Sequence, residues 1–214
     1  MSDEFRERVD EGVGEVFSED RFSDFIQKYG IPTVFVAKNA PWGQGSGNYL
    51  GQYLKEWGNQ IVIYENGWTS INDIGDTAGW VDREVYQAMD SQGRMQIKVG
   101  SGMKHTIRHE YGHHLQEVIT ADQRTQWRDL YFDSLGRIEA DGPLAGGMLG
   151  KDEDVQFKWA MKEGLGGQFP SVYGMVNTRE GFAETFSAVS DPEYDRDAYV
   201  EDLHPLLEFM EGLA

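Results

Sequence analysis

The feature that most constrains this chain is the sequence His-Glu-Tyr-Gly-His at residues 109–113. Helix residues four apart lie one turn apart on the same face, with Cβ atoms roughly 5–6 Å apart. The imidazoles of His109 and His113 can therefore bind one zinc ion at about 2.0–2.1 Å each. Glu110 lies beside them, where its carboxylate can take a proton from a water that zinc has acidified. The motif predicts a zinc site on a helix, with the chemistry of a metallopeptidase.

The residues around the motif also favour a helix. Apolar side chains recur at i, i+4, i+8 and i+11, namely at Ile107, Tyr111, Leu115 and Val118. This stripe lies away from the two histidines, so one face can pack while the other holds a metal. A third histidine, His105, is one turn earlier and cannot converge on the same ion. We assign it to the cleft wall or to a hydrogen bond.

A zinc hydrolase needs a third protein ligand. The metzincin motif requires Gly at position 116 and His at 119, where this chain has Gln116 and Ile119, so that class is excluded. Further along, Glu180 and Glu184 are one turn apart on one helix face. We predict Glu180 as the third ligand, and Glu184 as the acceptor of a hydrogen bond that fixes the tautomer of a ligand histidine. The alternative for Glu180 is a capping box begun by Asn177.

These residues carry a resemblance to a known family. Tyr173-Gly174, Asn177, Glu180, Phe182-Ala183-Glu184 and Phe186, after the 109–113 motif, resemble the catalytic domain of the anthrax lethal factor-like metallopeptidases, which include the Pro-Pro endopeptidases. The likeness is strong over residues 105–115 and 173–186 and weaker from about residue 60 onward. It implies a gluzincin, with zinc on His109, His113 and Glu180 and with Glu110 as the base. It also implies that the Tyr173 hydroxyl stabilises the oxyanion, although the sequence alone would make Tyr173 a packing aromatic.

The amino-acid composition limits the kinds of partner and of metal ligand that are expected. A formal net charge of −18 disfavours nucleic acid and anionic membranes. The chain has no cysteine, so histidine and carboxylate must bind any metal. We see neither a signal peptide nor a run of 18 apolar residues. We therefore expect a soluble protein that is cytoplasmic, virion-associated, or secreted with its signal removed. The sequence does not indicate an oligomeric state.

The order of the elements predicts the fold class. Residues 1–17 are acidic and contain glycine, so we expect a loosely ordered N-terminal arm before one domain at 18–214. Strands are predicted at 31–37, 60–64, 80–86 and 94–99, and loops at 41–51, 68–80 and 141–150. Helices are predicted from Ser18 as N-cap to Gly30, at 121–135 ended by Gly136, at 152–162, and at 194–213 with a break near Pro205. Strands first and helices later suggest an α+β, zincin-like fold.

The sequence thus predicts a zinc-dependent endopeptidase with one zinc per chain. An extended peptide or protein substrate would pair with a strand edge, for which the strand at 80–86 is the candidate. One alternative is a structural or binding module, virion- or toxin-associated, that keeps the zinc for stability. Another is a zinc amidase that acts on a non-protein amide.

Overall fold

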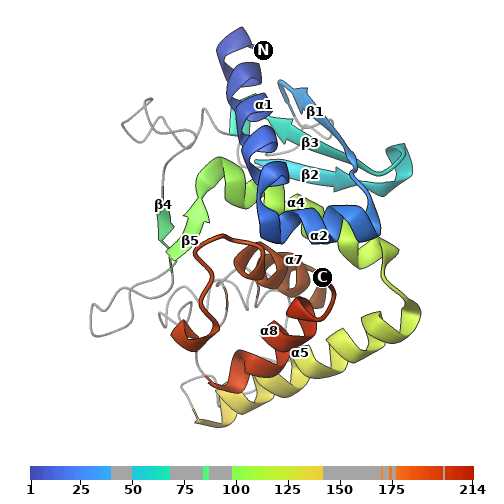
Figure 1. Cartoon of the computed structure of the whole chain (residues 1–214), viewed down its shortest axis with the longest axis vertical. Coiled ribbons are helices and arrows are strands. Elements are labelled where there is room, and N and C mark those ends of the chain that lie inside the picture. The colour runs from blue at the N-terminus through green and yellow to red at the C-terminus, as the bar shows by residue number, and fades with distance from the viewer. Residues whose placement is uncertain are drawn as a thin grey trace.

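The protein is described here from a computed structural model of the 214-residue chain (Figure 1). The structure describes residues 1–39, 50–67, 84–86, 98–141, 170, 174, 177–199 and 201–214. Of 84–86, 98–101 and 136–141 it describes the backbone alone. The loop predicted at 68–80 and the helix predicted at 152–162 lie outside these residues. So do most of the loops predicted at 41–51 and 141–150.

The N-terminal segment is a packed helix, so the prediction of a loose arm was wrong. Helix α1 spans Asp3–Ser18 and begins at the N-cap Ser2. Its buried residues, Phe5, Val9, Gly12 and Val16, recur about once per turn. A Cβ on Gly12 would lie 3.3 Å from both Met103 and Ile107, so α1 packs closely on the helix that carries those two residues. The prediction failed because the many charged residues of α1 obscured the apolar positions that recur along one face of the helix.

The second helix follows almost without a break. Helix α2 spans Asp20–Tyr29, with Glu19 rather than Ser18 at its N-cap, because Ser18 still belongs to α1. It ends, as predicted, at Gly30, whose φ of +83° favours glycine.

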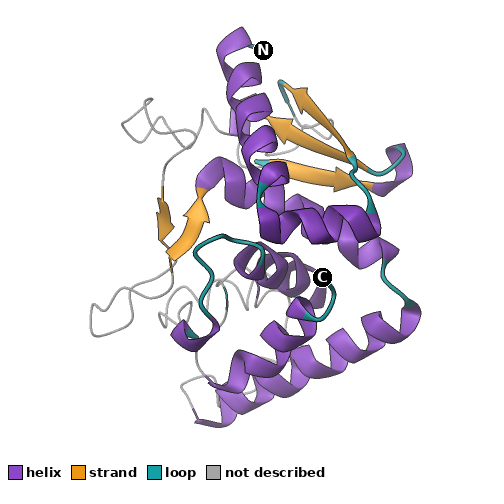
Figure 2. Ribbon diagram, viewed as in Figure 1, coloured by secondary structure: helices purple, strands orange, loops and turns teal. Residues whose placement is uncertain are grey.

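A three-stranded mixed sheet flanks these helices (Figure 2). Strands β1 (Thr33–Ala37), β2 (Gly51–Leu54) and β3 (Gln60–Tyr64) lie in the order β1-β3-β2. β1 is parallel to β3, with Thr33 opposite Gln60, and β2 is antiparallel to it, with Gly51 opposite Ile63. The 3-10 turn η1 (Lys55–Trp57) connects β2 to β3. β1 and β3 were predicted, whereas β2 was not.

A separate hairpin leads into the central helix. β4 (Glu84–Tyr86) pairs antiparallel with β5 (Lys98–Ser101), and both overlap predicted strands. Helix α4 (Gly102–Val118) follows β5 directly. It contacts α1, β2 and β3 on one side and α7 on the other, so it joins the two halves of the molecule seen in Figure 1.

The described part of the C-terminal half is mostly helical. α5 (Ala121–Asp141) continues past Gly136, where its end was predicted, because a single helical glycine costs only about 1 kcal/mol. Of the helix predicted at 194–213, only the second half is present, as α8, and the prediction for the first half was wrong because those residues form 3-10 turns. Pro205 lies in the first turn of α8, where proline is tolerated, and so begins this helix rather than breaking a longer one. The remaining elements are α7 (Thr178–Val189), η4 (Arg196–Ala198), η5 (Glu201–Leu203) and α8 (His204–Glu211).

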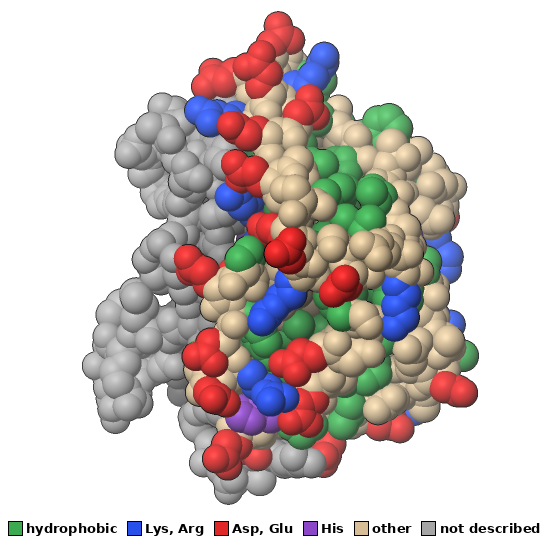
Figure 3. All heavy atoms as spheres, in the orientation of Figure 1, with side chains coloured by type: hydrophobic (Ala, Val, Ile, Leu, Met, Phe, Trp, Pro, Cys, Tyr) green, Lys and Arg blue, Asp and Glu red, His purple; other side chains and the backbone are tan. Residues whose placement is uncertain are grey.

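One core cluster contains residues from α1 to the C-terminal residues beyond α8. Aromatic rings join its helices: the Tyr111 ring on α4 lies 4.7 Å from Phe22 on α2 and 5.4 Å from Phe186 on α7, between centroids. The architecture is therefore mixed α+β and mostly helical. No described helix is both long and apolar enough to cross a bilayer. On the face shown in Figure 3, acidic side chains are spread along the molecule, as the net charge of −18 leads one to expect.

Candidate metal centre

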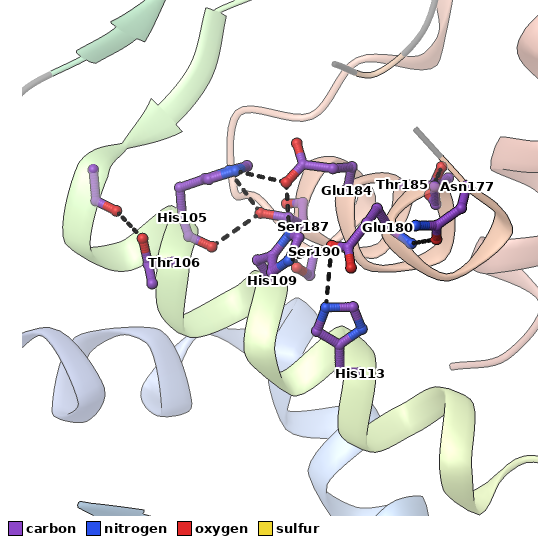
Figure 4. A network of polar contacts seen from close by, with 12 residues as sticks. His105, Thr106, His109, His113, Asn177, Glu180, Glu184, Thr185, Ser187 and Ser190 are labelled. Carbon is purple, nitrogen blue, oxygen red and sulfur yellow. Dashed lines mark hydrogen bonds and ion pairs between the residues drawn. The ribbon is translucent and has the colours of Figure 1, made fainter. Parts of the chain in front are cut away.

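The predicted site residues lie on α4 and α7, which approach unusually closely. A Cβ on Gly112 of α4 would lie 2.8 Å from the Cα of Ala183 on α7, closer than a side chain tolerates. Glycine at this position therefore lets the two backbones touch. His109 and His113 on α4 then face Glu180 and Glu184 on α7 (Figure 4).

The packing of α4 agrees with its predicted stripe at all but one position. Ile107, Tyr111 and Leu115 are fully buried, whereas Val118 is 41% exposed because the helix ends there. His109 and His113 are also buried and lie on the side facing α7.

Three ligand atoms converge between the helices. Oε2 of Glu180 lies 3.2 Å from Nε2 of His109 and 3.3 Å from Nε2 of His113. Two atoms bound to one tetrahedral zinc at 2.0–2.2 Å are roughly 3.3–3.6 Å apart. Oε2 of Glu180 is buried and has no partner with hydrogen-bond geometry among the described residues. The two separations are close to those of ligands around one ion, and neither contact has hydrogen-bond geometry.

A second group of possible ligands shares His109 but uses its other nitrogen. Oε1 of Glu184 lies 2.6 Å from Nδ1 of His109 and 3.2 Å from Nε2 of His105. The 2.6 Å separation is too short for two ligands of one ion, but it suits a strong hydrogen bond between an imidazole N–H and a carboxylate. Either group could hold a metal by composition, and the distances favour the one with Glu180.

The histidines and glutamates of the site shift one another's pKa values. Burial disfavours a charged His109, but Glu180 and Glu184 outweigh it and hold the pKa of His109 well above its ordinary value. Burial likewise acts to raise the pKa of Glu180, yet the imidazoles of His109 and His113 bring it far below the usual range. For Glu184, the histidines His105 and His109 overcome burial in the same way and lower the pKa. Both carboxylates are therefore anionic and suited to a cationic site.

Glu110 differs from the other two glutamates. It is 5% exposed, and burial raises its pKa, although His109 and His113 act against this. The backbone N–H of Tyr53 on β2 hydrogen-bonds to its carboxylate. A Cβ on Gly51 would lie 3.0 Å from both Cγ and Oε1 of Glu110, so this strand passes directly beside the glutamate.

The start of α7 fixes Glu180. The Asn177 side chain accepts hydrogen bonds from the backbone N–H groups of Arg179 and Glu180, at 2.8 and 2.9 Å. Half of the alternative capping box is therefore present. The Glu180 carboxylate, however, is directed at the two imidazoles. Capping by Asn177 and the placing of Glu180 in the site are thus compatible.

The structure brings together five predicted residues: His109, Glu110, His113, Glu180 and Glu184. Tyr173 lies outside the described residues. The hydrogen bond considered for His105 is present, and His114 and His204 make ordinary contacts with backbone carbonyls. Two participants were not predicted, Ser187 and Tyr53. Ser187 follows Glu180 and Glu184 on the same face of α7, a signal that the sequence did contain.

Comparison with known proteins gives no relative for this arrangement. The chain matches no protein-family model, no curated protein and no solved structure. The resemblance to the lethal factor-like metallopeptidases rests on the quoted residues alone. What the site does must therefore be argued from its chemistry.

Proposed function

We propose that this protein is a zinc-dependent endopeptidase of zincin-like fold, with one zinc per chain. His109, His113 and Glu180 would be the ligands and Glu110 the general base. The observation that carries the proposal is that Oε2 of Glu180 lies 3.2 and 3.3 Å from the Nε2 atoms of His109 and His113. The buried Glu110 lies beside these histidines on α4. Two histidines and one carboxylate form a ligand set of catalytic zinc, which leaves a fourth position open.

Zinc, when bound, supplies a Lewis acid that polarises the substrate carbonyl and acidifies a water molecule. Glu110 would take a proton from the attacking water and pass it to the amine nitrogen of the departing peptide. Its burial suits this role, because a raised pKa brings a carboxylate closer to the working pH of a general base. Glu184 accepts the Nδ1–H of His109, so that Nε2, which faces Glu180, is the nitrogen that would bind the metal.

The best candidate for the substrate edge among the described strands is β2. The Tyr64 N–H donates to the Leu50 carbonyl, so the alternating pattern directs the main-chain groups of Gly51 and Tyr53 away from β3. That outer edge lies beside Glu110. The strand predicted for this role, at 80–86, contains β4, which pairs with β5 along one edge. We propose that an extended peptide lies along β2.

The central experiment is metal analysis together with cleavage of a degenerate peptide library. Protein purified without chelator should hold about one zinc per chain. Glu110→Gln should keep the zinc and lose activity by orders of magnitude, because an amide cannot accept the proton. Glu117→Gln, at a partly exposed glutamate on the same helix, is the control and should cleave like wild type.

Three outcomes would contradict the proposal. Protein that lacks zinc and takes up none when it is added has no metal centre. Equal turnover in wild type and Glu110→Gln would remove the base. Stoichiometric zinc without cleavage of any peptide would favour the structural module or the amidase.

The role that the resemblance gives to Tyr173 is tested in the same assay. Tyr173→Phe should keep its zinc and reduce kcat by roughly 10²–10³, the effect of losing one oxyanion donor. Glu180→Ala should lose zinc affinity instead. Full activity in Tyr173→Phe would return this residue to a packing role.

A further inference from the structure

His105 is connected to the candidate metal centre through other side chains. It lies on α4 one turn before His109, and its ring makes two polar contacts with α7 (Figure 4). Its Nε2 lies 3.2 Å from Oε1 of Glu184, and its Nδ1 lies 2.8 Å from Oγ of Ser187. The same oxygen of Glu184 receives Nδ1 of His109 at 2.6 Å. The four side chains therefore form a continuous chain, Ser187–His105–Glu184–His109.

The chemistry of these groups gives the chain a direction. A carboxylate can only accept, so both histidines donate to Glu184, His105 through Nε2–H and His109 through Nδ1–H. Nδ1 of His105 is then the acceptor for the hydroxyl of Ser187. The Ser187 hydroxyl also lies 3.3 Å from the backbone carbonyl of His105, so both of its contacts are with this residue. Nε2 of His109 remains directed at Glu180.

The hydrogen bond from His105 matters because its partner Glu184 is buried. Glu184 is 3% exposed, and its second oxygen, Oε2, has no hydrogen-bond partner among the described residues. Its Oε1 thus carries both donors recorded for this carboxylate. Ser187 is 2% exposed, so water has little access to replace its hydroxyl. Removing either donor would leave a buried carboxylate poorly satisfied and free to turn.

We propose that His105 is a positioning residue, which with Ser187 behind it holds Glu184, and through Glu184 the His109 imidazole, in the orientation that binds metal. This inference rests on the proposed function, since it assigns His105 to that zinc site. It also excludes His105 as a ligand, because its nitrogens are directed at Glu184 and Ser187.

The test compares substitutions of matched size and polarity. His105→Leu removes both hydrogen bonds, whereas the amide N–H of His105→Gln can still donate from near the Nε2 position. Ser187→Ala removes only the hydroxyl. The controls are His114→Gln, at a buried histidine of the same helix that bonds to the Tyr29 carbonyl, and Ser190→Ala, at a buried serine just after α7 that bonds to a backbone carbonyl.

Two readouts are independent of activity. The first is the zinc dissociation constant, measured by competition with a chromophoric chelator. Loss of an outer hydrogen-bond partner typically weakens metal binding 10–100-fold, so we expect about tenfold for His105→Leu and about threefold for Ser187→Ala. His105→Gln and both controls should stay within about twofold of wild type.

The second readout is the ¹⁵N spectrum of the histidine rings, which is tractable in a chain with five histidines. In wild type, with or without zinc, Nδ1 of His109 should carry a hydrogen, and in His105→Leu its signal should shift toward that of a freely exchanging ring. Wild-type zinc affinity and an unchanged His109 signal in His105→Leu would overturn the proposal. So would an equal loss in His105→Gln, because shape rather than the donor would then matter. Wild-type protein that binds no zinc would refute the metal centre. The ring spectrum would still test the hydrogen bonds that connect Ser187, His105, Glu184 and His109.

Discussion

Gly112 controls the distance between the two helices of the site. Because a Cβ there would meet the backbone of Ala183 at 2.8 Å, Gly112→Ala must push α7 away from α4. We expect a loss of about 1–3 kcal/mol in unfolding free energy, the usual cost of overpacking, together with weaker zinc binding. Thermal unfolding and zinc titration would check both effects.

Gly14 provides the matched control for this substitution. It lies in α1, and a Cβ there would meet nothing within 4 Å. Gly14→Ala should therefore stabilise the protein by roughly 0.5–1 kcal/mol, through helix propensity alone. If Gly112→Ala behaved in the same way, the close contact between the helices would not be important.

At the residue scale, the sequence predicted which side chains gather between α4 and α7 better than it predicted their surroundings. His109 and His113 could be predicted to share one helix face because they are four residues apart. The same spacing predicts that Glu180 and Glu184 share a face. Ser187 and Tyr53 were missed because serine and tyrosine occur everywhere, and because Tyr53 acts through its backbone. Only the packing of α7 and β2 against α4 shows what these two residues contact.

At the scale of the elements, Ser2 links α1 to the end of β3. Its hydroxyl accepts from the N–H of Phe5 at 3.2 Å and donates to Glu65 at 2.7 Å, and its own N–H donates to Glu65 at 2.8 Å. These hydrogen bonds, chiefly the one from the hydroxyl, lower the pKa of Glu65 below its ordinary value. Ser2→Ala should cost about 1 kcal/mol near neutral pH, the typical value for a lost N-cap.

Part of that cost should depend on pH. A carboxyl group whose pKa is lowered by folding contributes stability above its unfolded pKa, about 4.3 for glutamate, and loses it as the pH falls through the folded value. The difference between wild type and Ser2→Ala in urea unfolding should therefore narrow as the pH falls below about 4. Ser18→Ala is the control, because this hydroxyl at the other end of α1 bonds to a backbone carbonyl. An equally large difference at every pH would mean that Ser2 acts only as a cap.

The elements that were missed share one physical cause. α1 and β2 each contact α4, and neither carries a motif that marks it in the sequence. In α1 charged residues and glycines lie between the apolar positions, and β2 is four residues long and begins with glycine. β3 was predicted from its apolar run, and α4 from the His-Glu-Tyr-Gly-His motif and the apolar stripe beside it, because little outside these segments is needed to recognise them.

At the scale of the whole molecule, Arg108 joins the N-terminal helices to the C-terminal half. It is 2% exposed, and its guanidinium contacts both oxygens of Glu19, at 2.6 and 2.7 Å, and Asp191, after α7, at 3.2 Å. Arg108→Ala would leave these carboxylates without their cation. We expect a loss of roughly 3–5 kcal/mol in unfolding free energy, as for other broken buried ion pairs.

Urea unfolding of Arg108→Ala beside Arg128→Ala would measure this effect. Arg128 is 59% exposed and pairs with its neighbour Asp129, so its removal should change stability by less than about 1 kcal/mol. Equal effects of the two substitutions would show that the Arg108 cluster does not hold the two halves together.

The proposed zinc ligands belong to helices that are far apart in the sequence, α4 and α7. In polymer terms, a bound ion would be a cross-link that closes a long loop of the chain. With no cysteine, the chain has no disulfide to take this part. An ion that binds only the folded state adds about 2.7 kcal/mol when its free concentration is a hundredfold above Kd. The temperature at which this protein unfolds would then depend on the zinc supply of its surroundings.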